Sequence, residues 1–322
     1  MDWDKRPNNL SAPSGRFEGA IDTLSTKTWD SWWRRRLQRK AWVYAGVHTD
    51  TLSIGFSIAD AGLLGNAFVY VYEREHGLLT EHQLMRPLAF ASNFAPTPHA
   101  PWQLKNRQQY YRWQPTDDHS SYLAEFSGDN LTLHCELTQN NRQISALNRL
   151  LDRPFQYTEK NIGLSSKITL DVNGRHYEYS SNHGVLDFSL GYPPRHTHWQ
   201  WVCLSGTASD GRTVGINAVA QFFNGLENTL WLGDAPPKPL PQMIFHYDPN
   251  AILDPWRMHS ADQRLALTFY PEGMREESIQ LGVFSSHFQQ PFGYFTGEYI
   301  NDDGATLSIS GYGVVEQHRT VW

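Results

Sequence analysis

The sequence predicts an all-β protein made of two similar antiparallel units. Alternating or β-branched segments recur along most of the chain, among them AWVYAGV, LSIGFSI, AFVYVYE, LTLHCELT, WQWVCLSG, TVGINAVAQF and TLSISGYG; such segments are typical of strands. Short turns that contain Gly, Asn or Asp separate many of them, for example VNGR, SDGR and NDDG. About fifteen to twenty short strands without a βαβ pattern indicate sandwiches or antiparallel barrels.

A start motif and an end motif each occur twice, in the same order. AWVYAGVHTDTLSIGFSI resembles QWVCLSGTASDGRTVGINA, so that Trp42 corresponds to Trp201, and HGVLD resembles YGVVE near the end of each unit. Repeats of this kind indicate a duplicated structural unit. We therefore expect a first unit over residues 41–192 and a second over 193–322, each a barrel or half-barrel, with the split near 190–197.

Two segments have helical rather than strand spacing. NRQISALNRLL predicts a helical insertion near residues 140–152, which would account for the greater length of the first unit. The N-terminal segment, residues 1–40, contains TWDSWWRRRLQRK, which predicts an amphipathic helix over 28–40. Its apolar face would consist of Trp29, Trp32, Trp33 and Leu37.

This helix has two interpretations. Arginines and a lysine occupy the rest of its surface. It either caps the open end of a barrel with its Trp face, or it makes peripheral contact with an anionic membrane.

Composition and charge exclude several classes of protein. Of 322 residues, 40% are hydrophobic and 19% are charged, as in a globular chain, and a net charge of −6 gives no general attraction to nucleic acid. The segment MDWDKRPNNLSAPSG has no apolar core of a secretory signal. Only Cys135 and Cys203 are present, which fits a reducing compartment. We expect a cytoplasmic protein; its oligomeric state is left open.

Aromatic residues are abundant, with 12 Trp, 15 Tyr and 16 Phe. Aromatic-rich interiors often line a cavity for a bulky apolar or cationic ligand. Aromatic ladders on the faces of β-sheets would explain the same composition.

Several ordered motifs carry a resemblance to a known family. RKAWVYAGV, YTEKNIGL, GVLDFSLGYPPRHTHWQWVCLSG, PFGYFTGEYINDDG and GVVEQHRTVW are similar to the bacterial family described as domain of unknown function 2804, over about residues 16–322. More distantly, the tandem layout resembles the carotenoid hydratase and Diels–Alderase group, in which two lipocalin-like barrels lie side by side. This implies a calycin fold and a pocket for a hydrophobic small molecule. No catalytic motif of that group is matched here residue by residue.

The segment HGVLDFSLGYPPRHTHWQW joins the two units and contains the candidate catalytic residues. Asp187 follows apolar residues on the closing strand of the first unit. Burial would raise its pKa and suit it to donate a proton, with His198 relaying the proton or positioning water. Alternatively Asp187 and its counterpart Glu316 close their barrels through ion pairs, Glu316 with Arg319.

The candidate ligand contacts are the aromatic and polar residues around this junction: Tyr192, His196, Trp199, Trp201, Asn217, Gln221, Glu227, Asn228 and Trp42. Core packing is the alternative for the paired tryptophans, and turn formation is the alternative for Glu227 and Asn228. Strand alternation places Trp199 and Trp201 on one face and His198 on the other.

We expect no metal and no cofactor. His183, His196 and His198 lie close in sequence, but no metal-ligand pattern, phosphate loop or nucleophile elbow accompanies them. Two functions remain open. One is binding of a lipid- or isoprenoid-like molecule near the junction of the units. The other is a cofactor-independent hydratase, isomerase or cyclase that works by acid catalysis, which a carboxyl group pointing into the pocket would favour.

Overall fold

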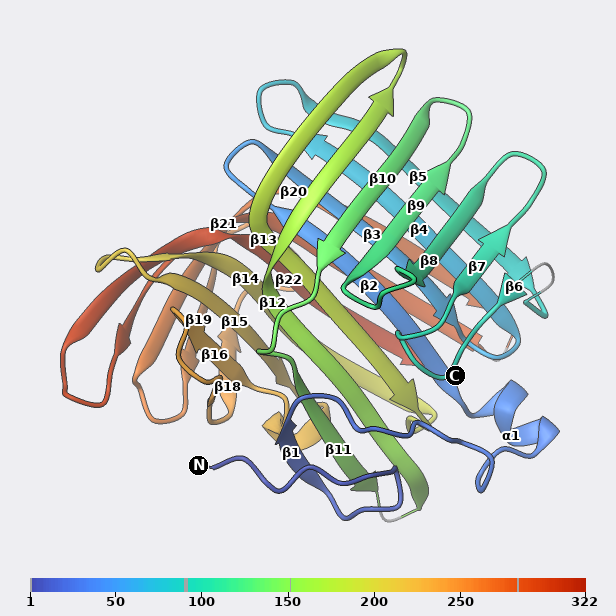
Figure 1. The fold of residues 1–322 in the computed structure, drawn as a ribbon, viewed down its shortest axis with the longest axis horizontal. Helices are drawn as coiled ribbons and strands as arrows, with labels where there is room; N and C mark the ends of the chain where they lie inside the picture. Colours follow the sequence, from blue (N-terminus) through green and yellow to red (C-terminus); the bar gives the residue numbers. More distant parts are fainter. Residues whose placement is uncertain (1, 90–91, 151, 283) are drawn as a thin grey trace.

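The protein consists of two antiparallel sheets (Figure 1). The computed structural model describes residues 2–89, 92–150, 152–282 and 284–322. The strands of the 13-stranded first sheet are β1 (Gly15–Glu18), β2 (Lys40–His48), β3 (Leu52–Asp60), β4 (Leu64–Glu73), β5 (Gly77–Pro87), β6 (Ser92–Asn93), β7 (Trp102–Lys105), β8 (Tyr110–Pro115), β9 (Ser121–Ser127), β10 (Leu131–Thr138), β11 (Ile144–Leu150), β12 (Arg153–Val172) and β13 (Arg175–Gly191).

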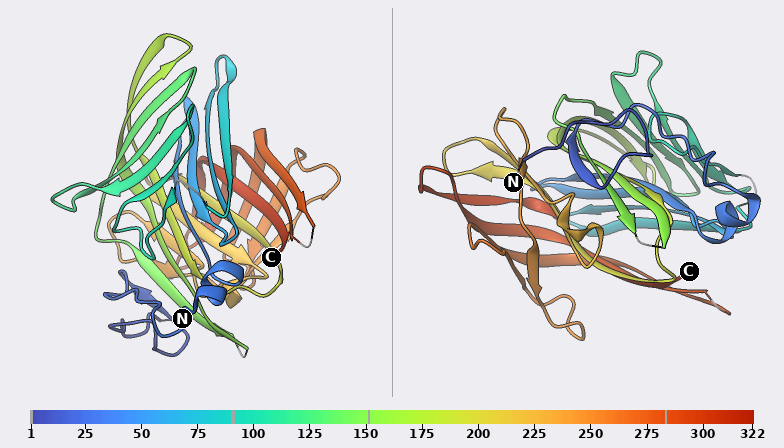
Figure 2. Two further views of the ribbon diagram at one scale, coloured as in Figure 1. Left: turned by 90° about the vertical axis from the view of Figure 1, so that its right-hand side faces the viewer. Right: turned by 90° about the horizontal axis from the view of Figure 1, so that it is seen from below.

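The 9-stranded second sheet follows in the chain after residue 195. Its strands are β14 (His196–Ala208), β15 (Thr213–Ala220), β16 (Thr229–Leu232), β17 (Lys238–Pro239), β18 (Met243–His246), β19 (Trp256–Ser260), β20 (Leu265–Leu281), β21 (Phe284–Ile300) and β22 (Thr306–Val321). Figure 2 shows both sheets strongly curled. The predicted all-β class, with two antiparallel half-barrel units, is confirmed.

The strand order explains why the start and end motifs are duplicated. The first sheet runs β5-β4-β3-β2-β13-β12-β10-β9-β8-β7-β6, and the second runs β17-β16-β15-β14-β22-β21-β20-β19-β18. In each sheet the last long strand of the unit pairs with its first: β13 with β2, and β22 with β14. Asp187 therefore lies opposite Tyr44, and Glu316 lies opposite Trp201.

Aromatic and aliphatic side chains form three separate cores. One fills the interior of the first sheet, with Trp102, Trp113 and Tyr122 fully buried, and a second fills the interior of the other sheet around Trp256. A third core lies between the sheets and includes Trp201. The abundance of aromatic residues thus serves both packing within each unit and packing between the units.

The predicted helix near residues 140–152 is wrong. Ile144–Leu150 is strand β11, which pairs with β12 on one side and β1 on the other; residue 151 lies outside the described residues. Ile144 and Leu147 are both buried, in different cores. Because both faces of β11 are covered, its apolar residues do not alternate, and their spacing resembles that of a helix.

The predicted helix over 28–40 is shorter than expected, and most of its predicted apolar face is exposed. Helix α1 (Trp32–Leu37) begins after Ser31, whose Oγ accepts a hydrogen bond from Arg34 N. It ends early because buried Arg39 is held by ion pairs to Asp30 and Asp60. Of the side chains expected to cover a barrel end, Trp29 packs on the core of the first unit, with its ring centre 5.1 Å from that of Phe155, whereas Trp32, Trp33 and Leu37 are exposed. Among the described helices, none is long and apolar enough to cross a bilayer.

A glycine allows the two sheets to approach closely. Gly215 of β15 lies against Ile162 of β12, and a Cβ atom at position 215 would lie 2.8 Å from Ile162 Cγ2. A separation below 3.0 Å requires something to shift, here the β-branched side chain of Ile162 or the backbone that carries it. Glycine is therefore required where the second sheet packs on the first.

We expect Gly215→Ala to lower the free energy of unfolding by about 1–3 kcal/mol through overpacking. The cost should be smaller in an Ile162→Ala background, because Cγ2 is then absent, and a double-mutant cycle in urea measures this coupling. A Gly215→Ala variant as stable as the native protein would contradict the close approach.

Candidate functional site

A cavity of about 140 Å³ lies between the two sheets, next to the core that joins them. Its lining is mainly aromatic, with contributions from Trp42, Phe68, Trp199 and Trp201. Polar residues gather where the lining is fully buried, and partly exposed aromatic residues such as Trp322 lie at the open end. Apolar pockets with a few placed polar groups are the usual sites for small molecules.

Side-by-side residues on neighbouring strands build the walls of this cavity. Across the first sheet the strand register aligns Lys160, Asp187, Tyr44, Ser57 and Phe68 on β12, β13, β2, β3 and β4. Across the second sheet it aligns two rows: Val219, Trp201 and Glu316, and Trp199, His318 and Phe288. Each row presents side chains on one face of its sheet, toward the other sheet.

Lys160 occupies the centre of a buried charge cluster. Its Nζ lies 2.6 Å from Asp187 Oδ1 and 3.5 Å from Glu227 Oε1, and 5.3 Å from the centre of the Trp201 ring. Burial alone lowers the pKa of Lys160, but the charges of Asp187 and Glu227 outweigh it and raise the pKa. Burial also raises the pKa of Glu227, an effect that Lys160 partly offsets. Asp187 therefore contacts a permanent cation.

Glu316 is the carboxyl group of the cavity without a cationic partner. Its Oε1 accepts a hydrogen bond from Trp199 Nε1 at 2.7 Å, and its Oε2 accepts one from Gln290 Nε2 at 2.9 Å. Burial raises its pKa to about 7, and the two hydrogen bonds limit the rise. The expected ion pair with Arg319 is wrong: residues three apart on a strand point to opposite faces, and Arg319 is exposed.

Asn217 and Asn228 lie behind the cavity lining and form hydrogen bonds with residues that belong to it. Trp201 Nε1 donates to Asn217 Oδ1 at 2.8 Å, and Asn217 Nδ2 donates to the backbone oxygen of Glu227 at 3.0 Å. Asn228 Oδ1 accepts from Val219 N at 2.8 Å, and its Nδ2 donates to Pro241 O. Neither amide lines the cavity. Asn217 instead fixes the orientation of the Trp201 indole.

Five further residues singled out in the sequence lie away from the cavity. His196 and His198 line a shallow groove on the opposite face of β14, as strand alternation requires, so His198 cannot serve Asp187 as a relay. Gln221 is exposed. Tyr192 donates to Asp30 Oδ1 at 2.6 Å inside the first unit. His183 is hydrogen-bonded to Ser205 of the second sheet. It does not line the groove that contains His196 and His198, so the three histidines do not form one set of metal ligands.

Several residues of the site carry no clear sequence signal. Arg275 is fully buried, with its guanidinium carbon 4.0 Å from the centre of the Phe68 ring and an ion pair of 2.9 Å to Glu277. His318 lies with its ring centre 4.3 Å from that of Trp199, and burial lowers its pKa to about 3. The alternation of Arg275 and Glu277 on one face of β20 is a sequence pattern that includes these two residues, and it does not extend to His318 on β22.

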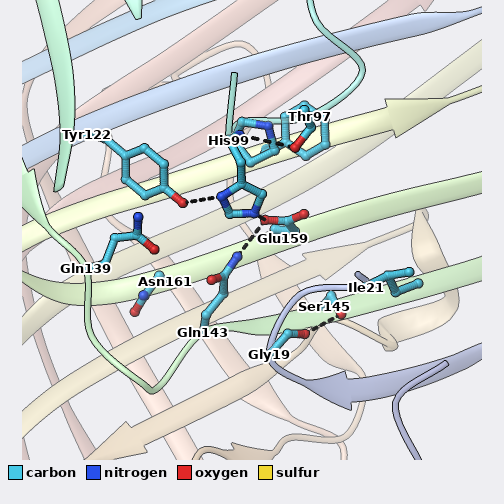
Figure 3. Close-up of polar contacts among 12 residues, drawn as sticks. Gly19, Ile21, Thr97, His99, Tyr122, Gln139, Gln143, Ser145, Glu159 and Asn161 are labelled. Atoms are coloured by element: carbon cyan, nitrogen blue, oxygen red, sulfur yellow. Dashed lines mark hydrogen bonds and ion pairs between the residues drawn. The ribbon is translucent and has the colours of Figure 1, made fainter. Parts of the chain in front are cut away.

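A second buried polar cluster lies inside the first unit (Figure 3). Glu159 accepts hydrogen bonds from Tyr157 OH at 2.8 Å and Gln143 Nε2 at 2.5 Å, and it lies 3.2 Å from His99 Nε2. His99 Nδ1 is 2.8 Å from Tyr122 OH. Burial lowers the pKa of His99, but the bond to Glu159 outweighs it and raises the pKa. Both ring nitrogens of His99 are thus engaged within the cluster.

Comparisons with known proteins agree with the architecture. Residues 5–322 match the family described as domain of unknown function 2804. The chain belongs to this family. Among curated proteins, none matches it in sequence.

Solved structures of this fold include a protein of Nitrosomonas europaea provisionally described as AttH, with 15% identity and a TM-score of 0.57 over 87% of this chain and 92% of the other. Kievitone hydratase from Nectria haematococca has 12% identity and a TM-score of 0.52 over 88% of this chain and 89% of its own. The resemblance to lipocalin-like hydratases is thereby confirmed at the level of fold.

We expect Lys160→Met to lower the free energy of unfolding by about 3–5 kcal/mol, because it leaves Asp187 and Glu227 buried without a cation. Urea unfolding measures the loss, and adding Asp187→Asn and Glu227→Gln should restore most of it. The matched control is Lys238→Met, whose partner Asp302 is exposed and whose loss should cost at most about 1 kcal/mol. Equal costs for the two lysines would rule out the buried cluster.

His318 should make stability sensitive to acid. Its folded pKa of about 3 lies below the unfolded value of 6.5, so its contribution is complete above pH 6.5 and is lost as the pH falls toward 3. One proton corresponds to about 1.4 kcal/mol per pH unit. We expect His318→Gln to reduce the slope of unfolding free energy against pH between 6 and 4 by about this amount. Exposed His196→Gln should leave it unchanged; an unaltered slope in His318→Gln would contradict the assignment.

Proposed function

We propose that the cavity between the sheets binds a mainly apolar small molecule and that Glu316 protonates it. The reaction class is that of a cofactor-independent hydratase, isomerase or cyclase. The observation that carries this proposal is a buried carboxyl group, with a pKa of about 7, in the lining of an aromatic cavity. General acids work best when their pKa lies near the ambient pH.

The groups around Glu316 suit a reaction that passes through positive charge. Protonation of an alkene or an enol ether leaves a cation on the substrate carbon. The rings of Trp42, Trp199 and Trp201 line the same cavity, and aromatic faces stabilise cations. The carboxyl groups of Asp187 and Glu227 lie in the same lining and share the Lys160 ammonium, which offsets part of their negative charge.

Asp187 is not the donor in this proposal. It lies 2.6 Å from the Lys160 ammonium, so a cation already contacts its carboxyl group. Glu316 has only neutral hydrogen-bond donors, from Trp199 and Gln290. Two carboxyl groups in one site with such different neighbours can take different roles, one donating the proton and one stabilising charge.

Binding without chemistry is the second candidate. Both oxygens of Glu316 already accept hydrogen bonds, and Trp42 stacks on Trp199 with ring centres 5.9 Å apart, an arrangement that would also hold a lipid- or isoprenoid-like ligand. A fold shared with a protein named as a hydratase supports the first candidate without assigning its substrate. The cytoplasm is the proposed compartment, because Cys135 and Cys203 are both buried free thiols.

The decisive experiment is mass spectrometry of ligands before and after contact with the protein. Protein is incubated with an apolar extract of its own host, bound molecules are identified by native mass spectrometry, and the supernatant is compared by chromatography. A hydratase produces a compound heavier by one water molecule, and an isomerase or cyclase produces one of equal mass. A bound ligand recovered unchanged supports the second candidate.

We expect Glu316→Gln to retain ligand binding and to slow conversion by about 10²–10⁴-fold, because the amide keeps the shape and lacks the acidic proton. The rate of the native protein should fall as the pH rises through about 7, since only protonated Glu316 donates. Exposed Glu298→Gln, on the neighbouring strand β21, is the matched control and should convert at the native rate. Conversion by Glu316→Gln at the native rate would exclude Glu316 as the donor.

A further inference from the structure

We propose that a surface beside the open end of the cavity docks on anionic lipid bilayers. This surface, here called the α1 patch, consists of Trp32, Trp33, Leu37, Leu63 and Leu88 with Arg34, Arg35 and Arg36. The proposal of docking rests on the exposed residues of the patch alone. The further statement, that ligand passes between bilayer and cavity, rests on the proposed function.

The α1 patch concentrates exposed apolar side chains. Trp32 and Trp33 are 64% and 65% exposed, and Leu37, Leu63 and Leu88 are 48%, 49% and 50% exposed. Of the twelve large hydrophobic side chains that are exposed in the described part of the chain, these are five. Single exposed hydrophobic residues are ordinary, but a contiguous group indicates a binding surface.

Backbone contacts show that the patch is contiguous. Arg36 Nη1 donates to Gly62 O at 3.3 Å and Leu88 O at 3.4 Å, and Leu88 N donates to Leu63 O at 2.7 Å. A Cβ atom on Gly62 would lie 2.1 Å from Arg36 O, so α1 packs directly on the turn between β3 and β4. The segments that carry the two tryptophans and three leucines are therefore directly adjacent.

The same surface adjoins the cavity. Leu63 lies between Ala61 and Leu64, which both line the cavity. On the other side, Lys40 Nζ donates to Leu37 O at 3.1 Å and lies 5.4 Å from the centre of the Trp322 ring, which also lines the cavity. Figure 2 shows α1 and the C-terminus at the same end of the molecule in its right-hand view.

Charge and residue type identify the partner as an anionic bilayer. Arg34 and Arg35 are exposed and Arg36 is half-buried, and the first turn of α1 contains no acidic residue. Because the whole chain has a net charge of −6, this positive surface is local and would orient the protein on a negative surface. Tryptophans insert at the level of lipid headgroups while arginines pair with anionic headgroups. Uncharged bilayers lack the second attraction.

The test is co-sedimentation with vesicles of phosphatidylcholine mixed with phosphatidylglycerol, and with vesicles of phosphatidylcholine alone. We expect binding to the mixed vesicles, weaker by at least about tenfold for phosphatidylcholine alone and reduced by added salt. The double variants Trp32→Ser/Trp33→Ser and Arg34→Gln/Arg35→Gln should each weaken binding by about tenfold or more. The exposed pair Leu253→Ser/Tyr270→Ser is the matched control and should bind as the native protein does.

Thermal unfolding of each variant establishes that it is folded. The proposal is overturned if the native protein binds neither vesicle, or if the patch variants bind as the native protein does. It is also overturned if the patch mediates self-association instead, which sedimentation velocity without lipid detects. Its failure is separable from that of the proposed function: Glu316→Gln should bind vesicles normally, and the patch variants should convert ligand supplied in solution at the native rate.

Discussion

The buried ammonium group of Lys160 is the interaction on which the arrangement of the two sheets depends. Lys160 and Asp187 belong to the first sheet, whereas Glu227 and the Trp201 ring belong to the second unit. A cation removed from water is tolerated only where opposite charges surround it. Any displacement of one sheet against the other would separate these charges, so the cluster determines how the sheets face each other and hence the shape of the cavity.

The position of Lys160 also gives the acidic residues of the cavity different partners. Lys160 neutralises the carboxylates nearest to it, and Glu316 is left with neutral hydrogen-bond donors and a pKa of about 7. The same burial that raises the pKa of Glu316 places its carboxyl group among the aromatic side chains of the cavity lining. An apolar cavity with one acidic proton and several aromatic faces is thus a consequence of how charge is balanced at the junction of the sheets.

The cavity with the aromatic lining lies at the junction of the sheets, whereas side chains fill the interior of each sheet. Trp102, Trp113 and Tyr122 occupy the interior of the first unit, and Trp256 occupies that of the second. The polar cluster around Glu159 and His99 fixes the loop that carries His99 and leaves no free hydrogen-bonding group on the imidazole. At the open end of the cavity, α1 is held by its backbone on the β3–β4 turn while its side chains face outward.

The all-β class, the duplication and the opposite orientations of Trp201 and His198 follow from the sequence, because strand alternation and turn residues are local properties. The pairing of Asp187 with Lys160 and the isolation of Glu316 do not, since they depend on strand register and on residues of the other sheet.

Ile144–Leu150 reads as a helix because both of its faces are buried, so no alternation marks it as a strand. Tertiary structure also limits the length of α1, because the ion pairs of Arg39 with Asp30 and Asp60 hold the chain at the start of β2. Local spacing therefore predicted most of the strands, whereas strand register and long-range charge pairing determined the site, the nature of β11 and the length of α1.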